Sequence, residues 1–140
     1  MEPVELGSAD GPRVILGEPL RGDNGELWRV PVTLELDGLR AEKTVNAHYA
    51  TCLDELIAYL DDLAANWNGW EGVKEYRSVE SDLVLQSRHD GYGHVTVEVT
   101  LSKMDGSPDE WTCTGRVTTE PGAQMEEAAA TARQLLVRFL

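Results

Sequence analysis

The sequence predicts an α+β protein in which a mostly antiparallel sheet of about six strands carries two amphipathic helices on one face. Three observations support this prediction. Several segments have apolar residues at every second position, two others have them at helical spacing, and the segments follow the order strands, helix, strands, helix. Tight turns between consecutive strands favour antiparallel pairing. Because each helix is apolar on one side only, we expect both to bury that side on the sheet.

The length of 140 residues predicts a single domain over residues 1–140. Residues 1–11 show no periodicity and are interpreted as a loose arm or an edge strand. Residues 13–20 form a short apolar segment, which a turn rich in glycine, Asp and Asn follows.

Residues 28–36 alternate between apolar and polar side chains, which predicts a strand with one buried face. The pair Asp37-Gly38 then predicts a hairpin turn into a strand over residues 39–47. Pro31 has no N–H group to donate, so we expect its strand at a sheet edge or with that nitrogen pointing outward.

The first helix is predicted to begin after Thr51, whose hydroxyl can cap it, with Asp54 as a weak form of the capping box. Acidic residues occupy one side of this helix. The other side is predicted to be buried and consists of Leu53, Leu56, Ile57, Leu60, Leu63, Ala64 and Trp67.

The second half of the chain predicts three further strands. They cover residues 78–89, 94–101 and 111–119, and the turns at 90–93 and 105–109 join them.

A final helix follows, with Pro121 in its first turn. Its predicted buried face consists of Met125, Ala128, Ala129, Ala132, Leu135, Leu136 and Phe139.

The chain has 25 acidic and 12 basic residues, a formal net charge of -13 and a pI of about 4.5. Such a charge repels nucleic acid and anionic membranes, so neither is an expected partner. No segment approaches about 18 consecutive apolar residues, and the amino end lacks the order of a signal peptide, so we expect a cytoplasmic protein. Two cysteines are too few for a disulfide scaffold or a four-cysteine zinc site.

His89 and His94 flank a short turn and are expected to face each other, with Cβ atoms roughly 5 Å apart. Two imidazoles at this spacing are candidate metal ligands, but the sequence places no third ligand beside them. A polar pair that supports the turn is the alternative interpretation.

Cys52 lies at the start of the first helix, four residues after His48, as a nucleophile would. The neighbouring Asp54 and Glu55 oppose a thiolate, so a small buried residue is the favoured interpretation. Cys113 alternates with apolar residues and is interpreted as core. No glycine-rich phosphate loop opens a helix, and we expect no cofactor.

The segment from Asp54 to Asp82 has eight acidic and two basic residues. This surplus exceeds what solubility requires and predicts a surface for a basic protein partner, although a solvated acidic helix is the alternative. Trp67 continues the helical stripe and is predicted to be core, whereas Trp70 is compatible with either a buried or a contact position. The candidate partner-binding residues are Asp54, Glu55, Asp61, Asp62, Trp70, Glu71 and Glu75.

Three turn and strand motifs stand close together in the sequence. They are Trp67-x-Gly69-Trp70-x-Gly72, Ser78-x-Glu80-x-Asp82-Leu83-x-Leu85 and His89-Asp90-Gly91-x-Gly93-His94-Val95-x-Val97-x-Val99-x-Leu101. This pattern resembles an actinobacterial family of unknown function, number 6228. More distantly, it resembles immunity proteins paired with wall-associated, contact-dependent toxins. The first resemblance implies no activity, cofactor or catalytic residue, and the second implies a binding protein that blocks a toxin.

We therefore expect a non-catalytic, acidic binding module of the immunity or accessory type that binds a basic protein, such as a toxin domain, and needs no cofactor. The alternative is a small-molecule- or metal-binding domain that uses His89 and His94. The chain is expected to be a monomer or a homodimer paired through an exposed sheet edge.

Overall fold

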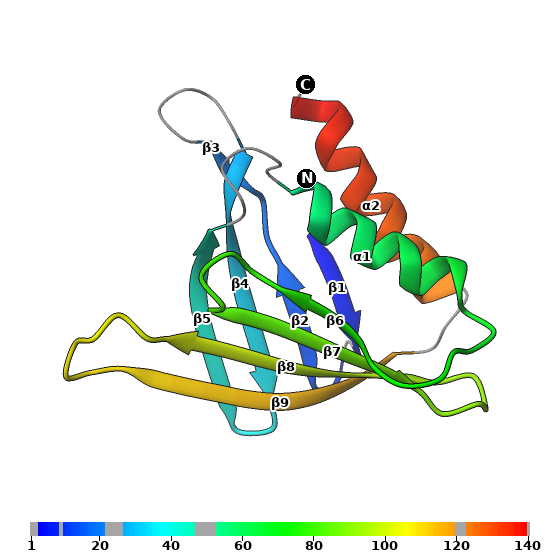
Figure 1. Cartoon of the computed structure of the whole chain (residues 1–140), viewed down its shortest axis with the longest axis horizontal. Helices are drawn as coiled ribbons and strands as arrows, with labels where there is room; N and C mark the ends of the chain where they lie inside the picture. Colours follow the sequence, from blue (N-terminus) through cyan, green and yellow to red (C-terminus); the bar gives the residue numbers. More distant parts are fainter. Residues whose placement is uncertain (1–2, 9, 22–26, 47–52, 120–122, 140) are drawn as a thin grey trace.

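Figure 1 shows the computed structural model, which describes residues 3–8, 10–21, 27–46, 53–119 and 123–139. The described residues form two antiparallel sheets and two helices. The strands of the first sheet are β1 (Val4–Gly7), β2 (Arg13–Leu16), β3 (Leu20–Arg21), β4 (Leu27–Leu36) and β5 (Leu39–Asn46). Those of the second sheet are β6 (Lys74–Arg77), β7 (Leu83–His89), β8 (Val95–Lys103) and β9 (Trp111–Thr119). The helices are α1 (Asp54–Ala65), between the two sheets in the chain, and α2 (Ala123–Phe139) at its end.

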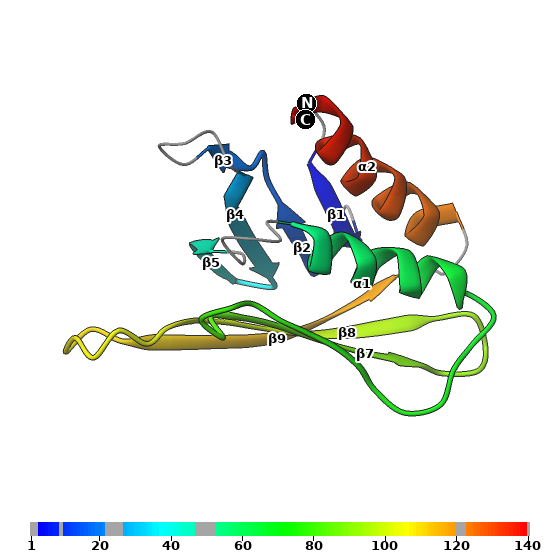
Figure 2. The ribbon, with the colours of Figure 1, turned by 45° about the horizontal axis from the view of Figure 1, so that its top comes forward.

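The prediction of one sheet of about six strands with both helices on one face is wrong. The first sheet has the order β1-β2-β4-β3 with β5 also paired to β4, and the second has the order β6-β7-β8-β9. Figure 2 shows the first sheet lying over one face of the second. The inward side chains of both, such as Leu34 of β4 and Leu85 of β7, join one buried cluster. Alternation in a sequence identifies the buried face of each strand but does not show which strands share a sheet.

Helix α1 contacts both sheets and lies between α2 and the second sheet (Figure 2). On one side, Leu56 and Leu60 line a small apolar cavity together with Val4 and Val30 of the first sheet. On the other side, the Tyr59 hydroxyl hydrogen-bonds to a serine of β7. The helix therefore packs against both sheets and does not cover one face of a single sheet. Its predicted buried residues Leu53, Leu56, Ile57, Leu60 and Leu63 are confirmed.

Helix α2 packs beside α1 and next to β1, as Figure 1 shows. The Nε2 group of Gln124 donates a hydrogen bond to the carbonyl oxygen of Gly7 at 2.7 Å, which joins the start of the helix to the end of β1. The burial of Met125, Ala128, Ala129 and Ala132 confirms this part of the predicted face. The small alanine side chains let the helix approach its neighbours closely.

The strand predicted over residues 78–89 begins only at Leu83 in the structure. Ser78 and Ser81 belong to a preceding turn, in which Ser81 has a φ of 60°. Sequence periodicity missed β6, because only Tyr76 of its four residues is buried and one buried side chain makes no pattern.

The two sheets are also joined by a partly buried ion pair. The Nζ group of Lys43 on β5 lies 3.0 Å from the Oδ2 atom of Asp82, just before β7. Asp82 is buried, and its Oδ1 atom accepts a hydrogen bond from the Ser78 hydroxyl at 2.5 Å.

Pro31 lies in β4, which is a central strand and not an edge strand. Its carbonyl accepts the N–H of Gly17 at 2.8 Å, just beyond the end of β2. The N and O atoms of one strand residue point to the same side, so the Pro31 nitrogen faces this gap in the pairing. The missing donor therefore disrupts no ladder hydrogen bond.

Some predictions fall on residues outside the described ones, namely the cap at Thr51 and the position of Pro121. The helix begins at Asp54, and Leu53 at the cap position makes no side-chain cap hydrogen bond.

Candidate functional site

The exposed side of α1 carries an acidic stripe. Asp54, Ala58 and Asp62 follow one another at a spacing of four residues and are all exposed, as is Glu55 in the first turn. A groove of about 440 Å³ separates this side of α1 from β6. We call it the α1–β6 groove; its lining residues are Glu55, Ala58, Tyr59, Asp62, Lys74, Glu75, Tyr76 and Arg77.

Three of the predicted partner-binding carboxylates pair with bases of this chain. The pairs are Asp61–Arg133, Asp62–Lys74 at 2.8 Å and Glu75–Arg77 at 3.1 Å. All three bases come from α2 or β6 and none from α1 itself. At least three of the six predicted carboxylates are therefore paired with a base, and the surface retains a smaller negative surplus than its acidic residues alone suggest.

Two buried tyrosines line the α1–β6 groove and are affected by its carboxylates. The pKa of Tyr59 is raised to about 12, mainly by burial; a hydroxyl hydrogen bond opposes this rise, and the charges of Asp62 and Glu75 add to it. Burial also raises the pKa of Tyr76 to about 12, with the charge of Glu55 as a smaller cause. Periodicity did not single out either tyrosine as a groove residue.

Most basic side chains form ion pairs within the chain. Of the twelve bases, ten have described side chains, and at least eight of these lie within ion-pair distance of a carboxylate. The eight are Arg13, Arg40, Lys43, Lys74, Arg77, Lys103, Arg116 and Arg133. Because the chain has 25 acidic residues, its carboxylates outnumber these bases.

The two tryptophans after α1 do not occupy the expected positions. Trp67 was predicted to be core and is 53% exposed, so that prediction is wrong. Trp70 is the one that packs against the core, and the Nζ group of Lys74 lies 5.5 Å from its ring centroid. Its indole nitrogen is buried without a hydrogen-bond partner among the described residues.

The reason is the position at which α1 ends. The Asn66 side chain donates a hydrogen bond of 2.9 Å to the carbonyl oxygen of Asp62, so the helix stops at Ala65. Trp67 therefore lies beyond the last helical turn, and its place in the apolar stripe no longer determines where its side chain points.

His89 joins the loop after α1 to the turn after β7. Its Nδ1 atom accepts the N–H of Gly91 at 2.9 Å, and its Nε2 group donates to the carbonyl of Trp67 at 3.0 Å. The Trp70 ring stands edge-on to the imidazole, with centroids 5.3 Å apart. A Cβ atom at Gly69, where φ is +129°, would lie 3.5 Å from the imidazole. Both ring nitrogens of His89 are thus engaged in holding the two loops together.

His94 has a different neighbour. Its Nδ1 atom lies 3.0 Å from the Oδ2 atom of Asp90, whose Oδ1 atom accepts the N–H groups of Tyr92 and His94. These backbone hydrogen bonds lower the pKa of Asp90. The carboxylate therefore holds the turn between β7 and β8 in one conformation.

A metal ion at His89 would have to displace the bond to Gly91 or that to Trp67. Within the described residues, no group of three or more His, Cys, Asp or Glu side chains is arranged to hold a metal. The metal-site hypothesis for His89 and His94 remains a prediction. Cys113 is a free, partly buried thiol on β9, while Cys52 and His48 lie outside the described residues.

The two histidines are expected to differ in their effect on stability. His89→Ala should lower the free energy of unfolding by about 1–2 kcal/mol, because it leaves two loop groups without their partner and removes a packed ring. His94→Ala, which changes an exposed side chain, should lower it by less than about 0.5 kcal/mol. Urea unfolding of both variants measures the difference, and equal effects would contradict the role of His89.

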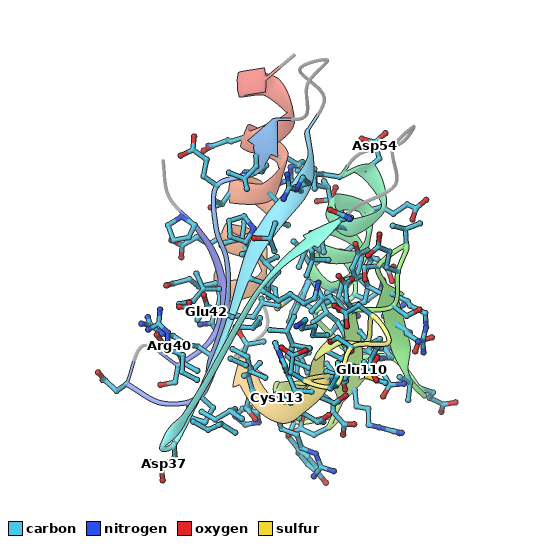
Figure 3. The ribbon with its side chains drawn as sticks, turned by 90° about the vertical axis from the view of Figure 1, so that its left-hand side faces the viewer. Asp37, Arg40, Glu42, Asp54, Glu110 and Cys113 are labelled. Carbon is cyan, nitrogen blue, oxygen red and sulfur yellow. The ribbon has the colours of Figure 1, made fainter. Side chains whose placement is uncertain are left out.

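A second groove, of about 550 Å³, lies between β5 and β9. Figure 3 labels Arg40, Glu42 and Cys113 along it. The Arg40 guanidinium lies 2.6 Å from Glu42 and 2.9 Å from Glu35, so these charges balance one another. This groove therefore does not carry the negative surplus of the chain.

No helix in the described part of the chain is long and apolar enough to cross a bilayer. The fold and the groove together define a two-sheet α+β protein with a groove beside its first helix that three carboxylates and two bases line. Residues 7–138 match the Family of unknown function (DUF6228), and the chain belongs to this family. No curated protein and no solved structure matches it.

Proposed function

We propose that this chain is a non-catalytic binding protein that takes a basic protein partner on the α1–β6 groove and the adjoining stripe of α1. The observation that supports this proposal is the charge balance of that surface. Six carboxylates lie on α1, the following loop and β6, and the three bases of this chain seen to pair with them are fewer than the carboxylates. The groove itself is lined by three carboxylates, two bases and two buried tyrosines. A surface with this balance attracts a cationic partner and aligns it during association.

The resemblance to immunity proteins adds a more specific form of the proposal. In this form the protein acts in the cytoplasm and blocks a basic toxin domain encoded beside it. Co-expression with a toxin domain from the neighbouring gene tests this form: restored growth and a co-purifying complex support it, and unchanged toxicity contradicts it.

The charge proposal is tested by placing two lysines on the acidic stripe. The variant combines Asp54→Lys with Ala58→Lys, and the new ammonium at position 58 lies at helical spacing from Asp62. We expect it to weaken binding of an acetylated Arg-Gly-repeat peptide about tenfold at about 20 mM salt, and less at about 150 mM salt. Isothermal titration calorimetry measures both affinities.

The matched control makes the same change in net charge elsewhere. It combines Asp37→Lys with Thr112→Lys, two exposed positions. Figure 3 shows Asp37 at the opposite end of the molecule from Asp54, and Thr112 pairs with Ser102 at the end of β9 away from the turn at 90–93. This control should bind the peptide within about twofold of the parent protein, since screening weakens a distant charge. Equal weakening in both variants would show attraction by net charge alone and would reject the proposed site.

A further inference from the structure

The loop after α1 and the turn after β7 form one connected surface at the end of the α1–β6 groove. Residues 66–72 and 89–94 come from distant parts of the chain, yet His89 hydrogen-bonds to the Trp67 carbonyl and to its own turn through Gly91. The Trp70 ring packs against the same imidazole. We call these two segments the two-loop surface.

This surface exposes two large aromatic side chains. Trp67 is 53% exposed and Tyr92 is 88% exposed. The backbone of both residues is hydrogen-bonded: the carbonyl of Trp67 accepts a hydrogen bond from His89, and the N–H of Tyr92 donates one to Asp90. No described contact to the core accounts for either ring.

The turn that carries Tyr92 is held in a defined shape. Gly91 and Gly93 on either side of it have φ values of 80° and 99°, which favour glycine. Asp90 accepts the backbone N–H groups of Tyr92 and His94 at 2.6 and 3.1 Å. The aromatic ring is therefore displayed on an ordered turn, as a binding anchor requires, because little loop entropy is lost on contact.

Three carboxylates lie in or beside the two loops that carry the exposed rings. Glu71 is exposed within the first loop, Asp90 lies within the turn, and Asp62 is joined to the first loop by the Asn66 amide at 2.9 Å. The nearby base Lys74 is already paired with Asp62 at 2.8 Å. Exposed aromatic faces beside carboxylates complement a guanidinium, which stacks on a ring while its N–H groups bond to an acid.

We propose that the two-loop surface is the contact site for arginine side chains of the basic partner, with Trp67 and Tyr92 as its aromatic anchors. This inference rests on the proposed function, because it names the part of that partner which the two loops receive. Trp and Tyr are the residue types that most often dominate binding at interfaces. The motif glycines and His89 then serve to hold the two anchors in place.

The test replaces both anchors with leucine, which keeps apolar side chains but removes the aromatic faces. Trp67→Leu combined with Tyr92→Leu should weaken binding of the Arg-Gly-repeat peptide by about five- to tenfold, with an unchanged thermal midpoint. The same variant should weaken binding of a Lys-Gly-repeat peptide by a smaller factor, because a guanidinium stacks on an aromatic ring better than an ammonium does. The matched control, Val79→Ala combined with Met104→Ala, alters two exposed apolar residues elsewhere and should bind like the parent.

Amide chemical shifts of the parent protein provide a second measurement that does not depend on any variant. Addition of the Arg-Gly-repeat peptide should shift the resonances of residues 66–72 and 89–94. If these residues do not shift, or the leucine variant binds as the parent does while the Asp54 and Ala58 lysine variant is weakened, the aromatic anchors are rejected and the α1–β6 groove remains. If neither variant affects binding, both proposals fail.

Discussion

The free energy of unfolding should fall by up to about 5 kcal/mol as the pH rises from about 10 to about 12, because two buried tyrosines resist ionisation. In the folded protein, burial raises the pKa values of Tyr59 and Tyr76 from 10.0 to about 12. Below a pH of about 10, which is the pKa of tyrosine in the unfolded chain, both the folded and the unfolded state keep the two hydroxyl protons, and the stabilisation is fully present. Between the two values the unfolded chain releases its protons while the folded chain retains them, so stability falls with rising pH.

Phenylalanine variants separate this effect from the loss of charge on lysines in the same pH range. Tyr59→Phe and Tyr76→Phe should each remove about half of the alkaline loss, whereas Tyr92→Phe, which alters a ring that is 88% exposed, should leave it unchanged. Urea unfolding at a series of pH values measures the slopes. A double variant with the same pH dependence as the parent would show that the two tyrosines do not cause it.

Lys43→Met should lower the free energy of unfolding by about 2–4 kcal/mol, because it leaves the buried carboxylate of Asp82 without its cation. The Nζ group of Lys43 lies 3.0 Å from Asp82, and the side chain of Asp82 is only 7% exposed. This pair connects β5 of the first sheet to the turn before β7 of the second, so its loss also weakens the contact between the sheets.

Arg40→Met is the matched control on the same strand. The Arg40 side chain is 60% exposed in its pair with Glu42, and pairs of this kind contribute less than about 1 kcal/mol. Combining Lys43→Met with Asp82→Asn should restore part of the lost stability, since no buried charge is then left alone. Chemical denaturation compares the three proteins, and an effect of Lys43→Met no larger than that of Arg40→Met would contradict the importance of this pair.

Local structure was predictable where one residue pattern repeats over many positions. The strand expected over residues 94–101 corresponds to β8, whose alternating Val95, Val97, Val99 and Leu101 are all fully buried. The pattern is strong because every second side chain enters the core. Strand β6 escaped prediction because its single buried residue repeats nothing.

The candidate site was predictable in composition but not in charge balance. The acidic residues of α1 are visible in the sequence, and nothing in their spacing shows that Arg133, 72 residues away, pairs with Asp61. The same holds for the two loops that His89 joins. Contacts between distant segments depend on the packing of the whole chain and leave no periodic pattern in either segment.

The strand and helix periodicity and the turns that need glycine can be read from the amino-acid sequence because they depend on neighbouring residues, and the surplus of negative charge can be read from the composition. Only the packing of the whole chain divides the strands into two sheets, brings bases from β6 and α2 to the acidic helix, and places Trp70 against the core while Trp67 is exposed. Helical spacing predicts which side chains share a buried face only for residues that lie within the helix. α1 ends at Ala65, and beyond that point packing against β7 and His89 selects the side chain that enters the core.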